Sequence, residues 1–197
     1  MPLPYLVDTN AYHLFFSNAA PDARKHLEAL LFNNGHIEFY ISEITSMEIY
    51  SVLGKDRRGI QKQEQICSRT ISDGVCTHTW LTAGRKGIKD KLFRQLIKLA
   101  SDIQGDTGAI RASILPLDNN VISAAKDFLI DYADRYNFGS QDALIAGTVI
   151  AYKEQYGNDL TVITSDRGLK VALSAARIPI LDPLAVSLSH SDELVKV

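Results

Sequence analysis

The chain has 197 residues, of which 46% are hydrophobic and 22% are charged, and its formal net charge is −2. This composition is that of an ordinary globular domain, so it excludes disordered, collagen-like and disulfide-stapled chains. The two cysteines and five scattered histidines, without an HExxH motif, argue against a zinc enzyme built on those residues. The longest apolar stretch, Ala143–Tyr152, is too short to cross a bilayer, and the start of the chain lacks a signal-peptide pattern. We therefore expect a cytoplasmic protein with no membrane association.

Charge is distributed unevenly along the chain. From Gly54 to Arg111 there are 12 Lys/Arg and six Asp/Glu, a net charge of +6, whereas the remainder carries −8. Acidic residues beside a basic surface suit a metal-dependent enzyme that acts on a polyanion. A solvated surface with uneven charge accounts for the same numbers, so the count leaves both interpretations open.

The first quarter of the chain alternates between strands and helices. Leu3–Val7 is a short apolar run typical of a buried strand, and the pattern then predicts a helix over Ala23–Phe32 and a strand over Ile37–Ile41. Ser42 is a candidate N-cap for the next helix, which we expect to stop at Gly54.

The segment of about 55–110 is the least regular part of the chain and reads as an insertion. Its one clear periodicity is an apolar helix face, ended by Gly105 and made of Ile88, Leu92, Leu96, Leu99 and Ile103. We therefore expect a basic, largely helical insertion in a single domain that spans residues 1–186.

The second half of the chain continues the alternation. Expected strands lie at 114–117, 160–164 and 178–181, expected helices at 121–132, 143–152 and 169–176, and a polar tail at 187–197. Asp118 and Ser140 are candidate helix caps. Nearly continuous apolar strands that alternate with helices predict an α/β fold with three layers, in which a parallel sheet lies between helices.

Four acidic side chains stand near the expected ends of these strands. Asp8 and Asp166 each follow a strand, Asp142 lies in the first turn of a helix, and Glu48 lies about one turn into another. Because active sites of parallel sheets lie at the carboxyl ends of the strands, all four can face one crevice. Two carboxylates about 4 Å apart repel by roughly 4 kcal/mol at an effective dielectric of about 20, so such a cluster must bind a cation or hold protons.

An all-oxygen set of ligands suits Mg²⁺ or Mn²⁺. Such an ion would activate water and stabilise charge that develops on a phosphate. Each acid also has a purely structural explanation, as a helix cap, a turn residue or a surface residue.

Five segments resemble sequence features of PIN-domain nucleases. The stretches Leu6–Asn10, Ser42–Ile49, Gln141–Gly147 and Thr164–Leu169 are similar, in order, to the four motifs of that family, and Ile114–Asp118 is similar to the strand before the third motif. The resemblance covers most of the chain apart from roughly 55–110 and the tail. It implies five parallel strands and Mg²⁺- or Mn²⁺-dependent hydrolysis of phosphodiesters, most often in RNA, with DNA as the alternative.

The catalytic and metal-binding residues would then be Asp8, Glu48, Asp142 and Asp166. Many members of the family are VapC-type toxins, each held inactive by an antitoxin and often dimeric, so an antitoxin partner and a homodimer are further expectations. Such toxins are usually shorter, and after Asp166 this chain has Arg167-Gly168 where relatives often carry another acid. The number of metal ions therefore stays open, and a stand-alone RNA-processing nuclease fits the extra length equally well.

Two further groups of residues are candidates for contact with ligand or substrate. The turn residues that can orient ligands or touch phosphate are Thr9, Asn10, Thr164 and Ser165. The cations that can contact a nucleic-acid backbone are Arg57, Arg58, Arg85, Lys86, Lys89 and Arg94. Trp80 can stack on a base, although a core position explains it as well. The insertion equally suits a helical hairpin that dimerises or docks a partner.

Two other classes of protein remain as alternatives. One is a scaffold that binds nucleic acid or a partner without chemistry. The other is a phosphotransfer protein of the receiver or haloacid-dehalogenase type, which also places an Asp after the first strand. The dehalogenase pattern requires a second Asp where this chain has Asn10, and a receiver requires a late Lys where it has Thr164-Ser165-Asp166.

Overall fold

A five-stranded parallel sheet forms the centre of the molecule. The computed structural model describes residues 3–17, 20–32, 37–71, 74–105, 107–108 and 110–185, and of residues 3, 63–71, 74–80 and 82 it describes the backbone alone. The sheet has the strand order β7-β2-β1-β8-β9. Its members are β1 (Leu3–Val7), β2 (Ile37–Ser42), β7 (Ser113–Leu115), β8 (Thr161–Ile163) and β9 (Ile180–Leu181). The edge position predicted for the last strand is confirmed.

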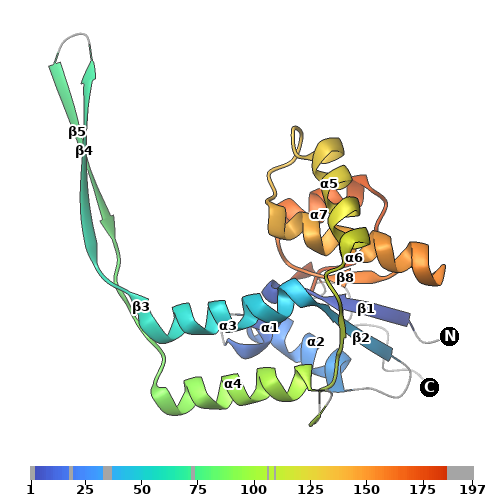
Figure 1. Cartoon of the computed structure of the whole chain (residues 1–197). Coiled ribbons are helices and arrows are strands. Elements are labelled where there is room, and N and C mark those ends of the chain that lie inside the picture. Colours follow the sequence, from blue (N-terminus) through green and yellow to red (C-terminus); the bar gives the residue numbers. More distant parts are fainter. Residues whose placement is uncertain are drawn as a thin grey trace, which may run out of the picture.

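Helices cover both faces of this sheet, so the three-layer α/β/α prediction is confirmed (Figure 1). The helices are α1 (Thr9–Phe16), α2 (Pro21–Phe32), α3 (Glu43–Arg58), α4 (Asp90–Gln104), α5 (Asn119–Tyr132), α6 (Ser140–Tyr156) and α7 (Arg167–Ala175). The first four pack with Val7 and Ile163 in one core, and the last three pack with Leu6 and Val162 in the other. Adjacent strand residues thus enter different cores, which explains why the strands are apolar throughout.

The order of the strands reverses next to β1. This strand pairs in parallel with β2 on one side and β8 on the other, with Tyr5 opposite both Phe39 and Thr161. The chain fills one side of β1 with β2 and β7 and then crosses to the other side with β8 and β9, and ligands of open α/β sheets bind at the carboxyl ends of the strands beside such a reversal.

The insertion differs from the prediction, because it is not largely helical. Only α4 bears out the predicted helix. The remainder is an antiparallel hairpin of β4 (Gln63–Ile71) and β5 (Gly74–Thr82), joined to the body by β3 (Gly59–Ile60) and β6 (Arg85–Lys86). We call residues 59–86 the arm, which projects from the body in Figure 1. The β-branched residues on either side of an Asp73-Gly74 pair are a hairpin signal that the analysis of charge overlooked.

Helix ends account for most of the other differences. Ser42 caps α3 as predicted, since its Oγ accepts from the Thr45 N–H at 3.1 Å, but Gly54 does not end this helix. A glycine inside a helix costs only about 1 kcal/mol, and α3 continues to Arg58, where Gly59 with φ of 70° follows. The N-cap of α6 is Gly139 and not Ser140, and α1 was not predicted.

The remaining local predictions agree with the structure. The cap predicted at Asp118 is confirmed, because its Oδ1 accepts from the Val121 N–H at 2.9 Å. Gly105 follows α4 as expected. Among the described helices none is both long enough and apolar enough to span a membrane. The predicted tail, 187–197, lies outside the described residues.

Close packing of α5 on α6 depends on Gly147. A Cβ atom at this position would lie 2.5 Å from the backbone oxygen of Val121 and 2.8 Å from the backbone nitrogen of Ala125. We expect Gly147→Ala to lower the free energy of unfolding by about 1–3 kcal/mol in urea titrations, since backbone atoms would have to move. Gly54→Ala is the control: its Cβ would meet only the end of the Arg58 side chain, at 3.6 Å. Stability should then stay the same or rise by up to about 1 kcal/mol. Equal losses in both variants would contradict this account of the packing.

Candidate active site

Asp8 lies at the centre of the carboxyl edge of the sheet. It follows β1 directly, its backbone N–H donates to the Ile163 carbonyl of β8 at 3.1 Å, and it is the N-cap of α1. Its Oδ1 accepts from the Thr9 N–H at 2.7 Å. Only 5% of the residue is exposed, so this carboxyl group is almost fully removed from water.

Glu48 is joined to Asp8 through Thr9. The cap at Ser42 starts α3 immediately after β2, which places Glu48 half-buried on the second turn of that helix. The hydroxyl group of Thr9 donates to Glu48 Oε2 at 2.8 Å. Thr9 thus contacts one acid with its backbone and a second with its side chain.

Thr164 makes the corresponding link after β8. Its hydroxyl group donates to Asp8 Oδ2 at 2.8 Å and accepts from the Asp166 N–H at 3.1 Å. Asp166 in turn caps α7, because its Oδ1 accepts from the Leu169 N–H at 2.8 Å. The capping role considered for Asp166 is therefore real, and it occupies only one of the two carboxylate oxygens.

Asp142 reaches the same edge from the first turn of α6. Its Oδ2 accepts from the Gly139 N–H at 2.8 Å, which fixes the side chain against the start of the helix. Gly168, at the start of α7, packs against the backbone carbonyl of Asn137 so closely that a Cβ atom would collide with it. Gly168 thus has a packing reason, because glycine lets the segment before α6 approach α7.

Burial and like charge act together on these acids. Burial raises the pKa of Asp8 to about 6; hydrogen bonds from Thr164 and Thr9 oppose the rise, and the negative charges of Glu48 and Asp142 add to it. Burial also raises the pKa of Asp142, against the Gly139 hydrogen bond, with further contributions from Asp166 and Glu48. All four predicted acids are therefore electrically coupled across one edge of the sheet.

The donor set fits a hard divalent cation in chemistry but is not closed around one point. The four acids supply only oxygen ligands, as Mg²⁺ and Mn²⁺ prefer. As the side chains stand, no group of three or more His, Cys, Asp or Glu within the described ranges is arranged to hold a metal ion. The structure thus brings the four predicted acids to one edge of the sheet without gathering three of them around a common point in the described ranges.

The other predicted residues divide into two kinds. Thr9 and Thr164 orient acids, whereas Asn10 is exposed and shows, like Ser165, no hydrogen bond to these acids in the described part of the chain.

Of the six predicted cations, three are held in ion pairs: Arg57 and Arg94 with Asp90, at 3.7 and 2.9 Å, and Arg85 with Asp56, at 2.6 Å. The side chain of Trp80 lies outside the described residues.

Two exposed lysines, Lys55 and Lys62, were not among the predicted contacts to a nucleic acid. Lys55 follows Glu48 by seven positions, which is two helical turns, so both residues lie on one face of α3. The spacing of seven positions can be seen in the sequence. It places Lys55 on the same helix face as Glu48 only if the helix continues past Gly54, where it was expected to stop.

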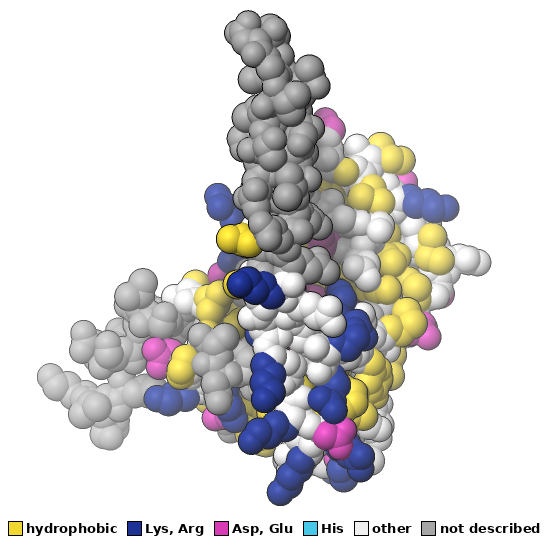
Figure 2. All heavy atoms as spheres, turned by 90° about the vertical axis from the view of Figure 1, so that its left-hand side faces the viewer, with side chains coloured by type: hydrophobic (Ala, Val, Ile, Leu, Met, Phe, Trp, Pro, Cys, Tyr) yellow, Lys and Arg dark blue, Asp and Glu magenta, His cyan; other side chains and the backbone are white. Residues whose placement is uncertain are grey.

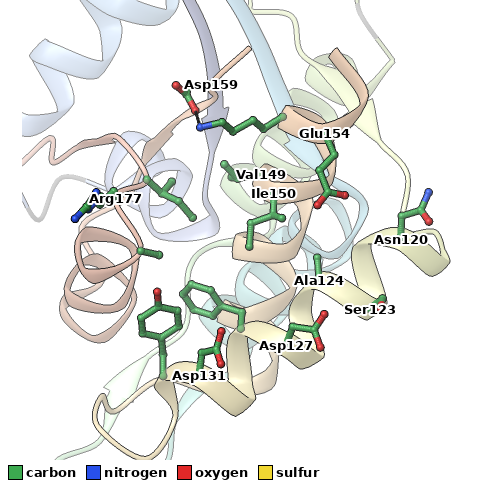
Figure 3. A pocket seen from close by; sticks show the side chains of 15 residues that line it. Asn120, Ser123, Ala124, Asp127, Asp131, Val149, Ile150, Glu154, Asp159 and Arg177 are labelled. Carbon is green, nitrogen blue, oxygen red and sulfur yellow. Dashed lines mark ion pairs between the residues drawn. The ribbon is translucent and has the colours of Figure 1, made fainter. Parts of the chain in front are cut away.

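A surface groove lies away from these acids. It has a volume of about 620 Å³ and is lined by α5, α6 and the residues that follow α7 (Figure 3). Asp127, Asp131 and Glu154 border it, and Lys153 forms an ion pair with Asp159 at 2.8 Å there. None of the four site acids lines it, and its own acids would repel a polyanion, so we place no substrate in this groove.

Comparisons with known proteins add no assignment. No model of a known protein family matches the chain, and no curated protein matches it either. The interpretation of the site therefore depends on its own geometry and chemistry.

The raised pKa of Asp8 predicts a specific pH dependence of stability. The pKa of Asp8 in the folded protein, about 6, exceeds the ordinary value of 3.8. Asp8 therefore stabilises the fold most below about pH 4, and its contribution to the free energy of unfolding is lost as the pH rises through 6. In chelator-treated buffer, urea unfolding should show a loss of at most about 3 kcal/mol between these limits. The loss should be much smaller in Asp8→Asn, which resembles the protonated acid.

Millimolar Mg²⁺ should restore stability to the wild-type protein at pH 7 but not to this variant, because a ligand of the native state stabilises it. Identical pH profiles for the two proteins would show that Asp8 does not titrate as described.

Proposed function

We propose that this protein is a nuclease that hydrolyses phosphodiester bonds, with RNA as its substrate and Mg²⁺ or Mn²⁺ as its cofactor. The observation that carries this proposal is the buried carboxyl group of Asp8, coupled to Glu48 and Asp142 at the carboxyl edge of a parallel sheet. Such an arrangement is unfavourable at neutral pH unless a cation compensates the charge. Four acids from four separate segments make that cation the most economical explanation of the site.

Each acid has a defined place in this proposal. Asp8, Glu48, Asp142 and Asp166 would hold the metal, which when bound supplies an activated water and stabilises charge on the phosphate. Thr164 and Thr9 act as positioning residues, because their hydroxyl groups fix the carboxylates of Asp8 and Glu48. The resemblance to PIN-domain nucleases points to the same four acids.

The choice of RNA rests on that resemblance and on the exposed cations near the arm. A toxin with an antitoxin, a homodimer and a stand-alone RNA-processing nuclease are all suggested by the resemblance alone, and the site does not favour one of them. A non-catalytic scaffold is the alternative, and one observation favours it: the described acids do not close around a common point.

The decisive test removes one acid from the cluster. Asp142→Asn should lower the rate of cleavage of a labelled RNA in Mg²⁺ or Mn²⁺ by at least about 100-fold, since outer-shell residues alone affect metal sites by roughly 10- to 100-fold. Asparagine retains an oxygen that can accept from the Gly139 N–H, so the helix start should survive. A chelator should abolish wild-type activity, and either metal should restore it.

Asp127→Asn is the matched control, because Asp127 is an exposed acid on α5 outside the cluster. It should cleave at the wild-type rate. Near-normal activity in Asp142→Asn would overturn the assignment of the site. Failure of the wild-type protein to cut RNA or DNA, together with no change in melting temperature on metal addition, would favour the scaffold.

A further inference from the structure

Exposed cations gather where the arm joins the body. We call this surface the arm-base face, and its members are Lys55, Arg58, Lys62, Lys86, Lys89 and Lys91. Nearby acids are already neutralised: Asp56 by Arg85, Asp90 by Arg94, and Asp102 by Lys98 at 2.7 Å. None of the six cations forms an ion pair with an acid in the described ranges. Among the side chains that the structure describes, this face therefore carries a net positive charge.

The arm-base face is continuous with the candidate active site through α3. Glu48 and Lys55 lie on one face of this helix, about 10 Å apart along its axis. A polyanion seated at the acids and extended along α3 would meet Lys55 next and then Arg58, at the end of the helix. The acid cluster and the cations Lys55 and Arg58 are thus connected along α3.

The base of the arm is held rigidly to the body. The Ile88 N–H donates to the Asp56 carbonyl at 3.0 Å, and the Arg57 guanidinium donates to the Ile88 carbonyl at 3.0 Å. The Asp56 carboxylate is also 3.3 Å from His13 of α1. Gly87 lies against the backbone of Arg57 so closely that a Cβ atom would collide with it. The cations of α3, β6 and α4 therefore keep fixed positions relative to the acids.

These cations do not lie along a single line. Lys55 and Arg58 belong to the end of α3, whereas Lys89 and Lys91 belong to the start of α4, and packed helices lie roughly 8–10 Å apart. Figure 2 views this end of the molecule and shows dark blue side chains spread over a broad area below the arm. A single nucleic-acid strand needs one row of cations, whereas a double helix presents two phosphate backbones on either side of a groove.

The α4 side of this face can provide further contacts. Asp90, Lys91, Arg94, Gln95 and Lys98 line a shallow hollow on α4. Arg94 and Lys98 are paired only with acids four residues away on the same exposed helix surface. Such exposed pairs contribute little to stability, so phosphate groups can replace them at little cost.

We propose that the arm-base face binds double-helical RNA and that the enzyme cuts the strand that leaves this stem at the acid cluster. The inference rests on the proposed nuclease function and adds the class of RNA. A stem contacts both rows of cations, whereas an unpaired strand contacts only one. Recognition would depend on backbone charge and A-form shape rather than on base sequence.

The test compares two substrates and two charge-matched double variants. Fluorescence anisotropy would measure binding of a labelled RNA stem of about 20 base pairs and of an unstructured strand of equal length. Chelator in the buffer prevents cleavage. Lys55→Gln combined with Lys91→Gln removes one cation from each row, and Lys25→Gln combined with Lys126→Gln removes the same charge from exposed sites outside this face.

The wild-type protein should bind the stem more tightly than the single strand. The first double variant should lose roughly 10-fold in affinity for the stem, and its log–log salt slope should fall by about 2, one for each phosphate contact. The control variant should behave like the wild type. Equal loss in both variants, tighter binding of the single strand, or binding of neither RNA would each overturn the inference.

The same proteins separate this inference from the proposed function. A wild-type protein that binds the stem through this face but never cleaves RNA or DNA would contradict the nuclease and leave the arm-base face intact. A protein that cleaves at an unchanged rate when Lys55 and Lys91 are both replaced would contradict the arm-base face and leave the nuclease. A change in oligomeric state without loss of RNA binding would assign the face to contact between copies of the chain.

Discussion

Burial of the Asp8 carboxyl group beside other acids is the constraint on which the site depends. A carboxylate removed from water loses its hydration, and Glu48 and Asp142 make its ionisation still less favourable. The fold provides partial compensation through the Thr9 N–H and the Thr164 hydroxyl group. The Thr164 hydroxyl group also links the segments that follow β1 and β8, which helps to hold the acids near one another against their repulsion. A locally unfavourable arrangement of charges that the rest of the fold stabilises is characteristic of functional sites.

Much of the fold could be predicted because local signals agree with the final packing. Leu6 and Val7 enter different cores, and a strand covered on both faces reads as a continuous apolar run. Ser42 and Asp118 both cap helices in the way their residue types suggest. The failures have local causes as well. Asp8 follows β1 directly and is also the N-cap of α1, so no loop residues mark the start of this helix in the sequence. The energetic penalty of one glycine at position 54 is too small to end α3.

The site was predictable in its acids and not in its supporting contacts. The topology rule places residues that follow parallel strands at one edge, so strand-end acids suffice to suggest a cluster. The bond from Thr164 to Asp8 joins residues 156 positions apart, and the approach of Gly168 to Asn137 depends on how two segments pack. The same limit applies to the cations: composition shows a basic segment, but only the fold shows that Arg85 is engaged by Asp56 while Lys86 is not.

The continuation of α3 past Gly54 provides the contacts that anchor the base of the arm. A two-stranded ribbon is only marginally stable on its own, so its orientation has to be imposed at its base. Asp56, on the helix that carries Glu48, imposes it by binding Arg85 and the Ile88 N–H, and Gly87 lies against the backbone of Arg57 in the same helix. A ligand that contacts the arm-base face therefore contacts a surface whose position relative to the acids is already determined, and less ordering entropy opposes its binding. That preorganisation is the strongest structural reason to treat the basic face and the acid cluster as parts of one surface.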